Sequence, residues 1–222
     1  MLIGIEGCIG AGKTTLLHWL SRACACPISV KPALAHPCHS VYEEPEHNPF
    51  LEDFYSEGGK RPFARHLLYS FLFLQERHLR HVLSQAAQGH QVVMDFHPLK
   101  NLIFGKILLS ARDQALLTEV YESLAVPEPD LMIHLIADEE VLLARLRKKQ
   151  VRHLEQLDFT FLTQLRYAYE VFFHSYPNRS ITIDTSRLDY FERTQDINVP
   201  LTAILEALDQ LPAEMLRPII EE

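Results

Sequence analysis

A glycine-rich segment that ends in lysine and threonine stands near the start of the chain. Residues 7–14 read GCIGAGKT and satisfy the phosphate-binding pattern GxxxxGK[ST]. Glycines let successive backbone N–H groups turn inward around phosphate oxygens, and the helix that follows adds its positive N-terminal end. Lys13 would place a charge beside the terminal phosphates of a nucleoside triphosphate, and the Thr14 hydroxyl would ligate Mg²⁺. The sequence therefore predicts that ATP and Mg²⁺ bind through Gly7, Gly10, Ala11, Gly12, Lys13, Thr14 and Thr15.

Three further groups of residues could complete a site for phosphoryl transfer. Glu43 and Glu44 follow an expected strand, and either carboxylate could take the proton of an attacking hydroxyl. Asp95 ends another strand, where a second Mg²⁺ contact is needed; an ordinary capping aspartate is the alternative. The basic run from Arg145 to Glu155 suits a flap over the phosphates at about 145–157, or else a solvated helix end.

Short apolar strands that alternate with helices must position these residues. We expect strands at 2–6, 40–42, 91–95, 131–136 and 180–185. We expect helices at 14–23, 62–88, 98–110, 112–125, 137–149 and 157–176. This alternation predicts an α/β fold of P-loop NTPase type, with a doubly wound, parallel, five-stranded sheet in a single domain over 1–222. The carboxyl ends of the strands would bring the P-loop, Glu43 and Asp95 together.

Composition narrows the class of protein. The 222 residues carry a formal net charge of -8, which argues against nucleic acid or a membrane surface as a partner. We expect no membrane span and no export signal, and therefore a cytoplasmic protein. Cys8, Cys24, Cys26 and Cys38 do not have zinc-site spacing, so reduced thiols are expected. No NKxD-type guanine motif is present, which leaves small-molecule kinases ahead of switch GTPases.

The ordered series of motifs resembles the deoxynucleoside kinase family, particularly the bacterial deoxyadenosine and deoxyguanosine kinase type. After the P-loop it comprises VYEEPEHNPFLEDFY, VVMD, EPDLMIHL, the RxxE of 152–155 and IDTSRLDYF, and it covers roughly residues 1–200. The resemblance implies Mg²⁺-dependent transfer of the ATP γ-phosphate to the 5'-hydroxyl of a deoxynucleoside, in nucleotide salvage. It also implies a homodimer, for which the apolar stretches 67–74 and 159–173 could supply the interface.

The resemblance assigns roles residue by residue. The family's general base follows the second strand: counting back from Asn48 selects Glu43, whereas matching the Glu-Pro pair selects Glu44. Tyr55 and Glu155 match the residues that bind the sugar 3'-hydroxyl, and Arg152 matches a flap arginine that faces phosphate. The segment Asp189 to Phe191 resembles the part that wraps the adenine of the donor.

Two departures from the family pattern affect the predicted site. Phe96 follows Asp95 where the family commonly has arginine, so Arg77 or Lys100 would have to supply that charge. Ser70 stands where a base-reading glutamine is expected, on a helical stripe of His66, Ser70, Phe73 and Arg77. The stripe is either the nucleobase pocket or an exposed face. Either His66 or Gln75 compensates through a shifted helix register, or the acceptor is not a standard purine deoxynucleoside.

Two other functions compete with this interpretation. A nucleoside monophosphate kinase of thymidylate kinase type shares the P-loop and an early Glu-Pro pair. It would need basic residues for the phosphate of its acceptor, and the acidic segment EEPEHNPFLED disfavours it. A nucleotide-binding regulatory protein without turnover is the second, because of the missing arginine and the few arginines in the flap.

Overall fold

The computed structural model describes residues 1–24, 38–56, 61–86, 91–148 and 159–210. A parallel sheet lies at the centre, with the strands in the order β2-β3-β1-β4-β5. The strands are β1 (Leu2–Gly7), β2 (Cys38–Val41), β3 (Gln91–Met94), β4 (Leu131–Ile136) and β5 (Ser180–Asp184). This arrangement confirms the predicted α/β fold with five parallel strands.

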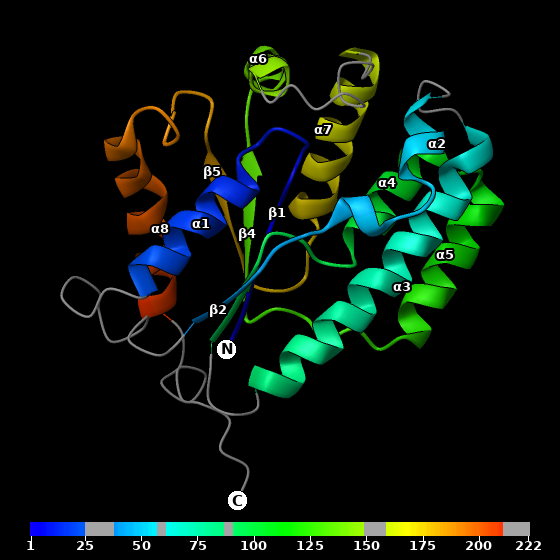
Figure 1. The fold of residues 1–222 in the computed structure, drawn as a ribbon, viewed down its shortest axis with the longest axis horizontal. Coiled ribbons are helices and arrows are strands. Elements are labelled where there is room, and N and C mark those ends of the chain that lie inside the picture. The colour runs from blue at the N-terminus through cyan, green and yellow to red at the C-terminus, as the bar shows by residue number, and fades with distance from the viewer. Residues whose placement is uncertain (25–37, 57–60, 87–90, 149–158, 211–222) are drawn as a thin grey trace, which may run out of the picture.

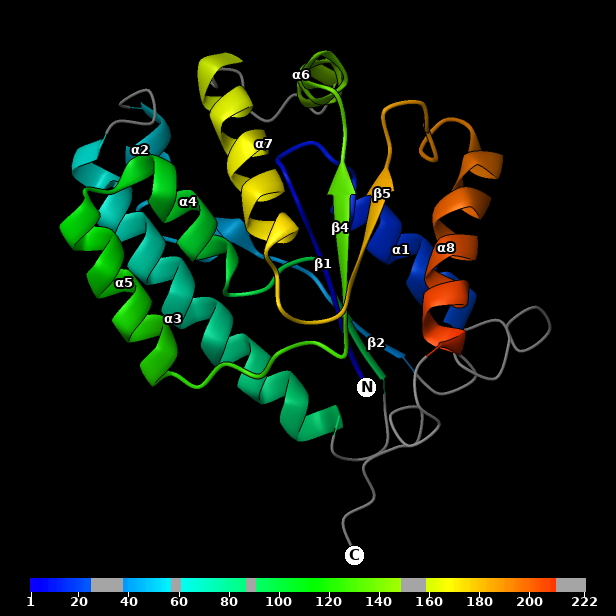
Figure 2. The ribbon, with the colours of Figure 1, turned by 180° about the vertical axis from the view of Figure 1, so that it is seen from behind.

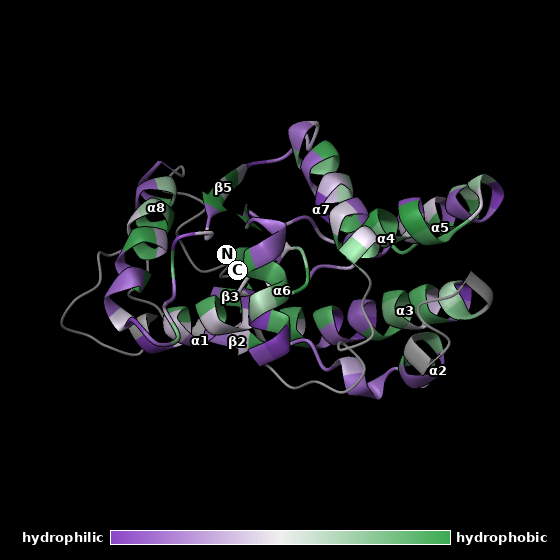
Figure 3. Cartoon of the chain, turned by 90° about the horizontal axis from the view of Figure 1, so that it is seen from above, coloured by the Kyte–Doolittle hydropathy of each residue, from purple (hydrophilic) through white to green (hydrophobic). Residues whose placement is uncertain are grey.

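Helices cover both faces of the sheet (Figures 1 and 3). On one side lie α1 (Lys13–Cys24) and α8 (Asn198–Asp209). On the other side lie α3 (Arg61–Ala86), α4 (Lys100–Leu108), α5 (Ala111–Ser123) and α7 (Phe159–His174). The short α2 (Leu51–Ser56) packs on α3, and α6 (Glu139–Lys148) follows β4 beyond the end of the sheet where the strands finish (Figure 1). The helices on both faces explain why the central strands are almost wholly apolar.

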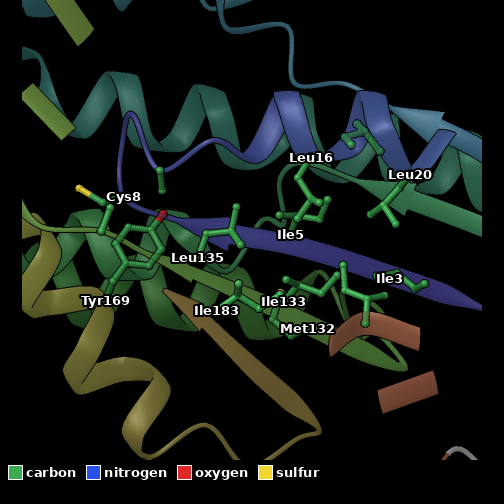
Figure 4. Packing of buried hydrophobic residues seen from close by; sticks show 14 of the residues in the cluster. Ile3, Ile5, Cys8, Leu16, Leu20, Met132, Ile133, Leu135, Tyr169 and Ile183 are labelled. Atoms are coloured by element: carbon green, nitrogen blue, oxygen red, sulfur yellow. The ribbon is translucent and has the colours of Figure 1, made fainter. Parts of the chain in front are cut away.

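The core forms where β1, β4 and α1 meet (Figure 4). Ile3 and Ile5 of β1, Leu16 of α1 and Ile133 of β4 are at most 1% exposed. Behind them, β5 runs beside β4 with α8 against it (Figure 2). Burying a leucine or isoleucine side chain contributes about 1.5–3 kcal/mol, so this core fixes the strands whose ends carry the site.

The P-loop, the segment after β2 and the segment after β3 all lie at the carboxyl ends of adjacent strands. The register pairs Val41 with Met94 and Gly4 with Met94, so β2, β3 and β1 finish close together. Asp95 N–H donates to the Val41 carbonyl at 3.2 Å and continues this pairing past β3. Parallel α/β sheets bind ligands at this edge.

Two helices were not expected from the sequence, α2 and α8, and the latter follows a 3-10 turn at Thr194–Ile197. The other described strands and α-helices lie within a few residues of the predicted ones, and a short 3-10 turn at Pro45–His47 was also not predicted. The ends predicted at 88 and 149 and the start predicted at 157 lie outside the described residues. No helix in the described part is both long enough and apolar enough to span a membrane.

Candidate active site

The P-loop adopts a backbone that only glycine tolerates at its critical positions. Gly12 has φ of +101°, and a Cβ there would lie 2.3 Å from the Tyr190 hydroxyl oxygen. A Cβ on Gly7 would lie 2.3 Å from the Leu135 carbonyl oxygen of β4. Both glycines are therefore needed for the loop to pass close to its neighbours as well as for its curvature.

Lys13 folds back over the loop that precedes it. Its Nζ donates to the carbonyl of Gly7 at 2.8 Å and to that of Cys8 at 3.3 Å. Burial lowers the pKa of Lys13, and the charge of Lys100 lowers it further, while Glu6 and Glu43 oppose both effects. A lysine held at the mouth of an amide nest can turn toward phosphate oxygens when these arrive.

A chain of hydrogen bonds joins the P-loop helix to the ends of β2 and β3. Thr14 Oγ1 donates to Asp95 Oδ2 at 2.6 Å, and the backbone N–H of Glu43 donates to Asp95 Oδ1 at 2.7 Å. Burial raises the pKa of Asp95, and these two hydrogen bonds oppose the rise.

A hydroxyl and a carboxylate oxygen side by side are a donor pair that suits Mg²⁺ with substrate phosphates and water. The described residues contain no group of three or more His, Cys, Asp or Glu able to hold a metal ion. A magnesium ion bound here would therefore take most of its ligands from the nucleotide and from water. Cys8 is a free, buried thiol.

Of the two candidate bases, Glu43 is the one that faces the P-loop. Its carboxylate accepts hydrogen bonds from Lys100 Nζ at 2.5 and 2.6 Å and from Gln75 Nε2 at 2.7 Å. Its side chain is 17% exposed. Glu44 points elsewhere: its side chain is 52% exposed and lies 2.9 Å from His47 Nδ1. The geometry therefore favours Glu43, the residue selected by counting back from Asn48.

Lys100, on the first turn of α4, supplies the positive charge beside Glu43. Burial alone would lower the pKa of Lys100, but Glu43 and Glu6 raise it above its ordinary value. The ammonium also lies 5.7 Å from the centre of the Phe71 ring and 6.0 Å from that of Phe104, within cation–π range. Of the two candidates to replace the missing arginine, Lys100 meets the carboxylate, whereas Arg77 is exposed.

A cavity of about 410 Å³ opens between the P-loop and the helices α2, α3, α4 and α7. Its polar lining includes Lys13, Thr14, Glu43, Asp95 and Lys100, so the reactive groups form one end of it. Its apolar wall includes Leu51, Phe54, Leu67, Leu68, Phe71 and Phe104. The shape combines a charged end with an apolar, partly aromatic end, which suits a small ligand with a flat ring.

The predicted base-reading stripe does not line this cavity. His66 and Phe73 are exposed, and the His66 ring contacts that of Phe50 in a tilted arrangement with ring centres 5.3 Å apart. Ser70 lines none of the cavities found in the described part, and Arg77 lines a second cavity of about 460 Å³ that also touches Glu43. The exposed face is thus the alternative that the structure favours, because Leu67, Leu68 and Phe71 turn the other side of α3 inward.

Gln75 reaches Glu43 from α3, but it is not among the residues that line the 410 Å³ cavity. Its side chain is buried, donates to Glu43 and accepts from Asn101 Nδ2 at 2.8 Å. Both ends of the amide are therefore engaged. Gln75 and Lys100 both donate to Oε1 of Glu43, and together they fix the orientation of this carboxylate.

The expected donor segment forms a cavity of about 610 Å³ beside the P-loop. Gly10, Gly12, Thr15, Asp189 and Phe191 all line it, and Phe191 is 80% exposed. Tyr190, which lies between Asp189 and Phe191 in the chain, packs against Gly12, and its carbonyl accepts a hydrogen bond from Trp19 Nε1 at 3.0 Å. The segment is thereby held next to the phosphate loop.

Arg145 joins the donor segment to the P-loop from the end of α6. Its NH2 group donates to the carbonyls of Thr185 at 2.6 Å and Leu188 at 2.7 Å. Its NH1 group donates to the Thr185 hydroxyl at 3.0 Å and approaches the Gly10 carbonyl at 3.4 Å. These contacts occupy the guanidinium, so it stabilises the loop and is not free to bind phosphate.

Three predicted residues lie wholly or partly outside what the structure describes. Arg152 and Glu155 fall in the segment 149–158, together with most of the predicted flap. Tyr55 belongs to α2, but its side chain is outside the described part. Their roles stay predictions.

The sequence did not single out three residues that shape the site: Glu6, Asn101 and Tyr169. Tyr169 lines the cavity from α7, and its hydroxyl donates to Glu6 Oε2 at 3.1 Å across 163 residues of chain. An ionisable residue within an otherwise apolar strand, such as Glu6 in LIGIEG, was the available signal. No local sequence pattern indicates Tyr169, the tyrosine that hydrogen-bonds to Glu6.

Comparison with known proteins decides the family. The family model described as deoxynucleoside kinase matches residues 3–206. The chain belongs to the deoxynucleoside kinase family. It is 30% identical over 172 residues to the deoxyguanosine kinase of Bacillus subtilis, covering 76% of each chain. It is also 29% identical to a probable thymidylate kinase of Archaeoglobus fulgidus, covering 84% of this chain and 88% of the relative.

Solved structures agree on the fold of this deoxynucleoside kinase. The deoxyadenosine kinase of M. mycoides, solved with dCMP and dCDP, superposes with a TM-score of 0.74 at 19% identity. The match covers 93% of this chain and all of that one. The protein is therefore a phosphotransferase of the deoxynucleoside kinase family, with the predicted P-loop kinase fold.

Proposed function

We propose that this kinase transfers the γ-phosphate of ATP to the 5'-hydroxyl of a deoxynucleoside, with Glu43 as general base. The observation that carries the proposal is the position of Glu43. Its carboxylate lies at the charged end of the 410 Å³ cavity, shared with Lys13 of the P-loop, and is held by Lys100 and Gln75. A hydroxyl placed there would meet a carboxylate on one side and the phosphate loop on the other.

The protein contributes to this reaction mainly by positioning the reactants and by stabilising the charge of the transition state. As the 5'-oxygen forms its bond to the γ-phosphorus, its proton passes to Glu43, and the bond to the β-phosphate oxygen breaks to release ADP. Lys13 stabilises the charge on the phosphoryl oxygens, and Arg152 of the predicted flap is assigned the same task. Thr14 and Asp95 would hold Mg²⁺, which would supply positive charge against the phosphates of the nucleotide.

The substrates occupy the two cavities that meet at the P-loop. The donor base lies beside Asp189 and Phe191, in the 610 Å³ cavity. The acceptor lies in the 410 Å³ cavity, with its base between the apolar residues of α3 and α4. Tyr55 and Glu155 are proposed to bind its 3'-hydroxyl. Two relatives are named deoxyguanosine kinase and deoxyadenosine kinase, and a third is named deoxyadenosine/deoxycytidine kinase, which supports deoxyguanosine and deoxyadenosine as first candidates and deoxycytidine as the next.

Steady-state assays of ADP release with all natural deoxynucleosides test this proposal directly. We expect turnover with at least one deoxynucleoside, and none above background with deoxynucleoside monophosphates. Turnover of dTMP alone would instead establish a thymidylate kinase, the function suggested by the name of one relative. Tight ATP binding without turnover on any acceptor would support a regulatory protein.

We also propose that two copies associate through α4 and α7. Tyr167 and Val171 of α7 are 65% and 52% exposed, and they border a groove shared with Ile103 and Ile107 of α4. The other predicted stretch, 67–74, contributes Leu67, Leu68 and Leu72 to the core, but its Phe73 is 50% exposed. Exposed aromatic and aliphatic side chains in one groove mark an interface more often than a free surface. A cytoplasmic location and a single domain remain predictions from the sequence.

A further inference from the structure

Glu6 is a carboxylic acid in β1 that the reaction described above does not use. Its side chain is 0% exposed. Oε1 accepts a hydrogen bond from the backbone N–H of His97 at 2.6 Å, and Oε2 accepts one from the Tyr169 hydroxyl at 3.1 Å. Figure 4 shows Tyr169 reaching from α7 with its hydroxyl oxygen turned toward β1. Burying a carboxyl group in the centre of an apolar sheet costs folding free energy unless the group is paired.

Both hydrogen-bond partners lead to the acceptor cavity. Tyr169 lines it directly. His97 begins the turn into α4: its ring accepts from Leu99 N–H at 3.3 Å, and Lys100 N–H donates to the His97 carbonyl at 3.0 Å. Glu6 therefore fixes the turn from which Lys100 extends toward Glu43.

The negative charge of Glu6 also acts on Lys100. Burial would lower the pKa of Lys100, and Glu43 and then Glu6 are the main charges that keep it raised. Burial in turn raises the pKa of Glu6 to about 7, against the pull of Lys100 and Lys13. The ionisable groups that act on Glu6 are Lys13 of α1, Glu43 after β2, Lys100 of α4 and Tyr169 of α7. His134 of β4 pairs with Glu6 in the sheet register, and burial lowers the pKa of this histidine to about 4.

We propose that Glu6 is a positioning residue for phosphoryl transfer, which keeps Lys100 charged and directed at Glu43. The inference rests on the proposed roles of Glu43 and Lys100. When Glu43 takes the proton of the acceptor hydroxyl, it loses the negative charge that pairs with Lys100. Glu6 and Asp95 are then the carboxylates that still act on Lys100, and Glu6 also anchors the turn that carries it.

The decisive variant is Glu6→Gln, which keeps the shape and removes the charge: its amide oxygen can accept from the His97 N–H, and its NH2 group can donate to the Tyr169 hydroxyl oxygen. At pH 8 we expect its kcat with a deoxynucleoside to fall about five- to tenfold, with the KM for ATP nearly unchanged. At pH 6 the wild-type carboxyl is itself largely protonated, so the two enzymes should converge. Glu6→Asp, which keeps the charge, is the matched control and should follow the pH profile of the wild type at reduced height.

Stability separates this role from ordinary packing. A carboxyl whose pKa is about 7 when folded and near 4.5 when unfolded takes up protons on folding, so it costs stability as pH rises between these values. Glutamine carries no such cost. The melting temperature of Glu6→Gln above pH 7 should therefore equal or exceed that of the wild type, although its activity is lower.

Two further measurements decide the case even if turnover proves weak. In a double-mutant cycle, Glu6→Gln should have little additional effect once Lys100→Met has been introduced. In an NMR titration of ¹³C-labelled lysine, the Lys100 signal should titrate at a lower pH in Glu6→Gln than in the wild type. An equal loss of kcat at every pH with a lower melting temperature, or an unmoved Lys100 titration, would overturn the inference. Absence of any deoxynucleoside turnover by the wild type would count against the proposed function instead, because the titration needs no turnover.

Discussion

Replacing Glu43 by glutamine tests the assignment of the general base. The amide keeps the size of the side chain and can still accept a hydrogen bond from Lys100, but it cannot take a proton. General-base catalysis contributes about 10²- to 10⁴-fold, so kcat should fall by that factor, which corresponds to roughly 2.7–5.4 kcal/mol of barrier. ATP contacts a different cavity, so the dissociation constant for ATP should stay within about threefold.

Glu44→Gln is the matched control, because the two carboxylates are adjacent and have the same chemistry. Glu44 is half exposed and pairs with the solvent-exposed His47, and such surface pairs are worth about 0–1 kcal/mol. Its kcat should stay within about threefold of the wild type. Both variants are assayed for ADP release at saturating ATP and acceptor, with melting temperatures to exclude unfolding. The reasoning is refuted if Glu44→Gln shows the large loss and Glu43→Gln does not.

Four other changes have predictable outcomes. Lys100→Met should lower kcat by about 10- to 100-fold, because it removes the cation beside Glu43; unchanged turnover in ADP-release assays would exclude that role. Gly12→Ala should destabilise by about 1–2 kcal/mol, or roughly 2–8 °C in melting temperature, since φ is +101° and the new methyl meets Tyr190. Arg145→Ala should raise the KM for ATP and not that for the acceptor, with partial rescue by added guanidinium; an equal rise in both constants would contradict a donor-side role. Val171→Asp should shift a dimer to monomer in sedimentation, and a wild-type monomer would rule out the proposed interface.

The parts of the fold that the sequence predicted are those with strong local signals. The central strands β1, β3 and β4 are mainly apolar because helices cover both faces of the sheet, and the P-loop is recognisable from its glycines, lysine and threonine. The missed α2 has only six residues, so its form depends on packing against α3 and not on propensity. The missed α8 carries an apolar stripe, with Pro200 near its start, and this pattern could have revealed it.

The site was harder to predict because it depends on contacts between distant segments. Sequence could not decide between Glu43 and Glu44, since one residue of offset after a strand turns the side chain to the opposite side. The decision comes from Asp95, which holds the Glu43 backbone in place 52 residues away. Similarly, helical spacing gave two possible inner faces for α3, and only its packing against α2 and α4 selects the face that contains Phe71 and Gln75.

The source of positive charge distinguishes this site from the pattern expected for its family. An arginine directly after the strand-end acid would present a planar fork, but here Phe96 is buried in that place against His78. Arg145, the other guanidinium close to the P-loop, is held by carbonyl oxygens. Within the described residues, the cations that line the acceptor cavity are therefore two lysines, Lys13 and Lys100. An ammonium loses its charge more readily than a guanidinium when buried, so a lysine-based site needs carboxylates to keep it protonated. That requirement gives a physical reason for a glutamate in the middle of β1.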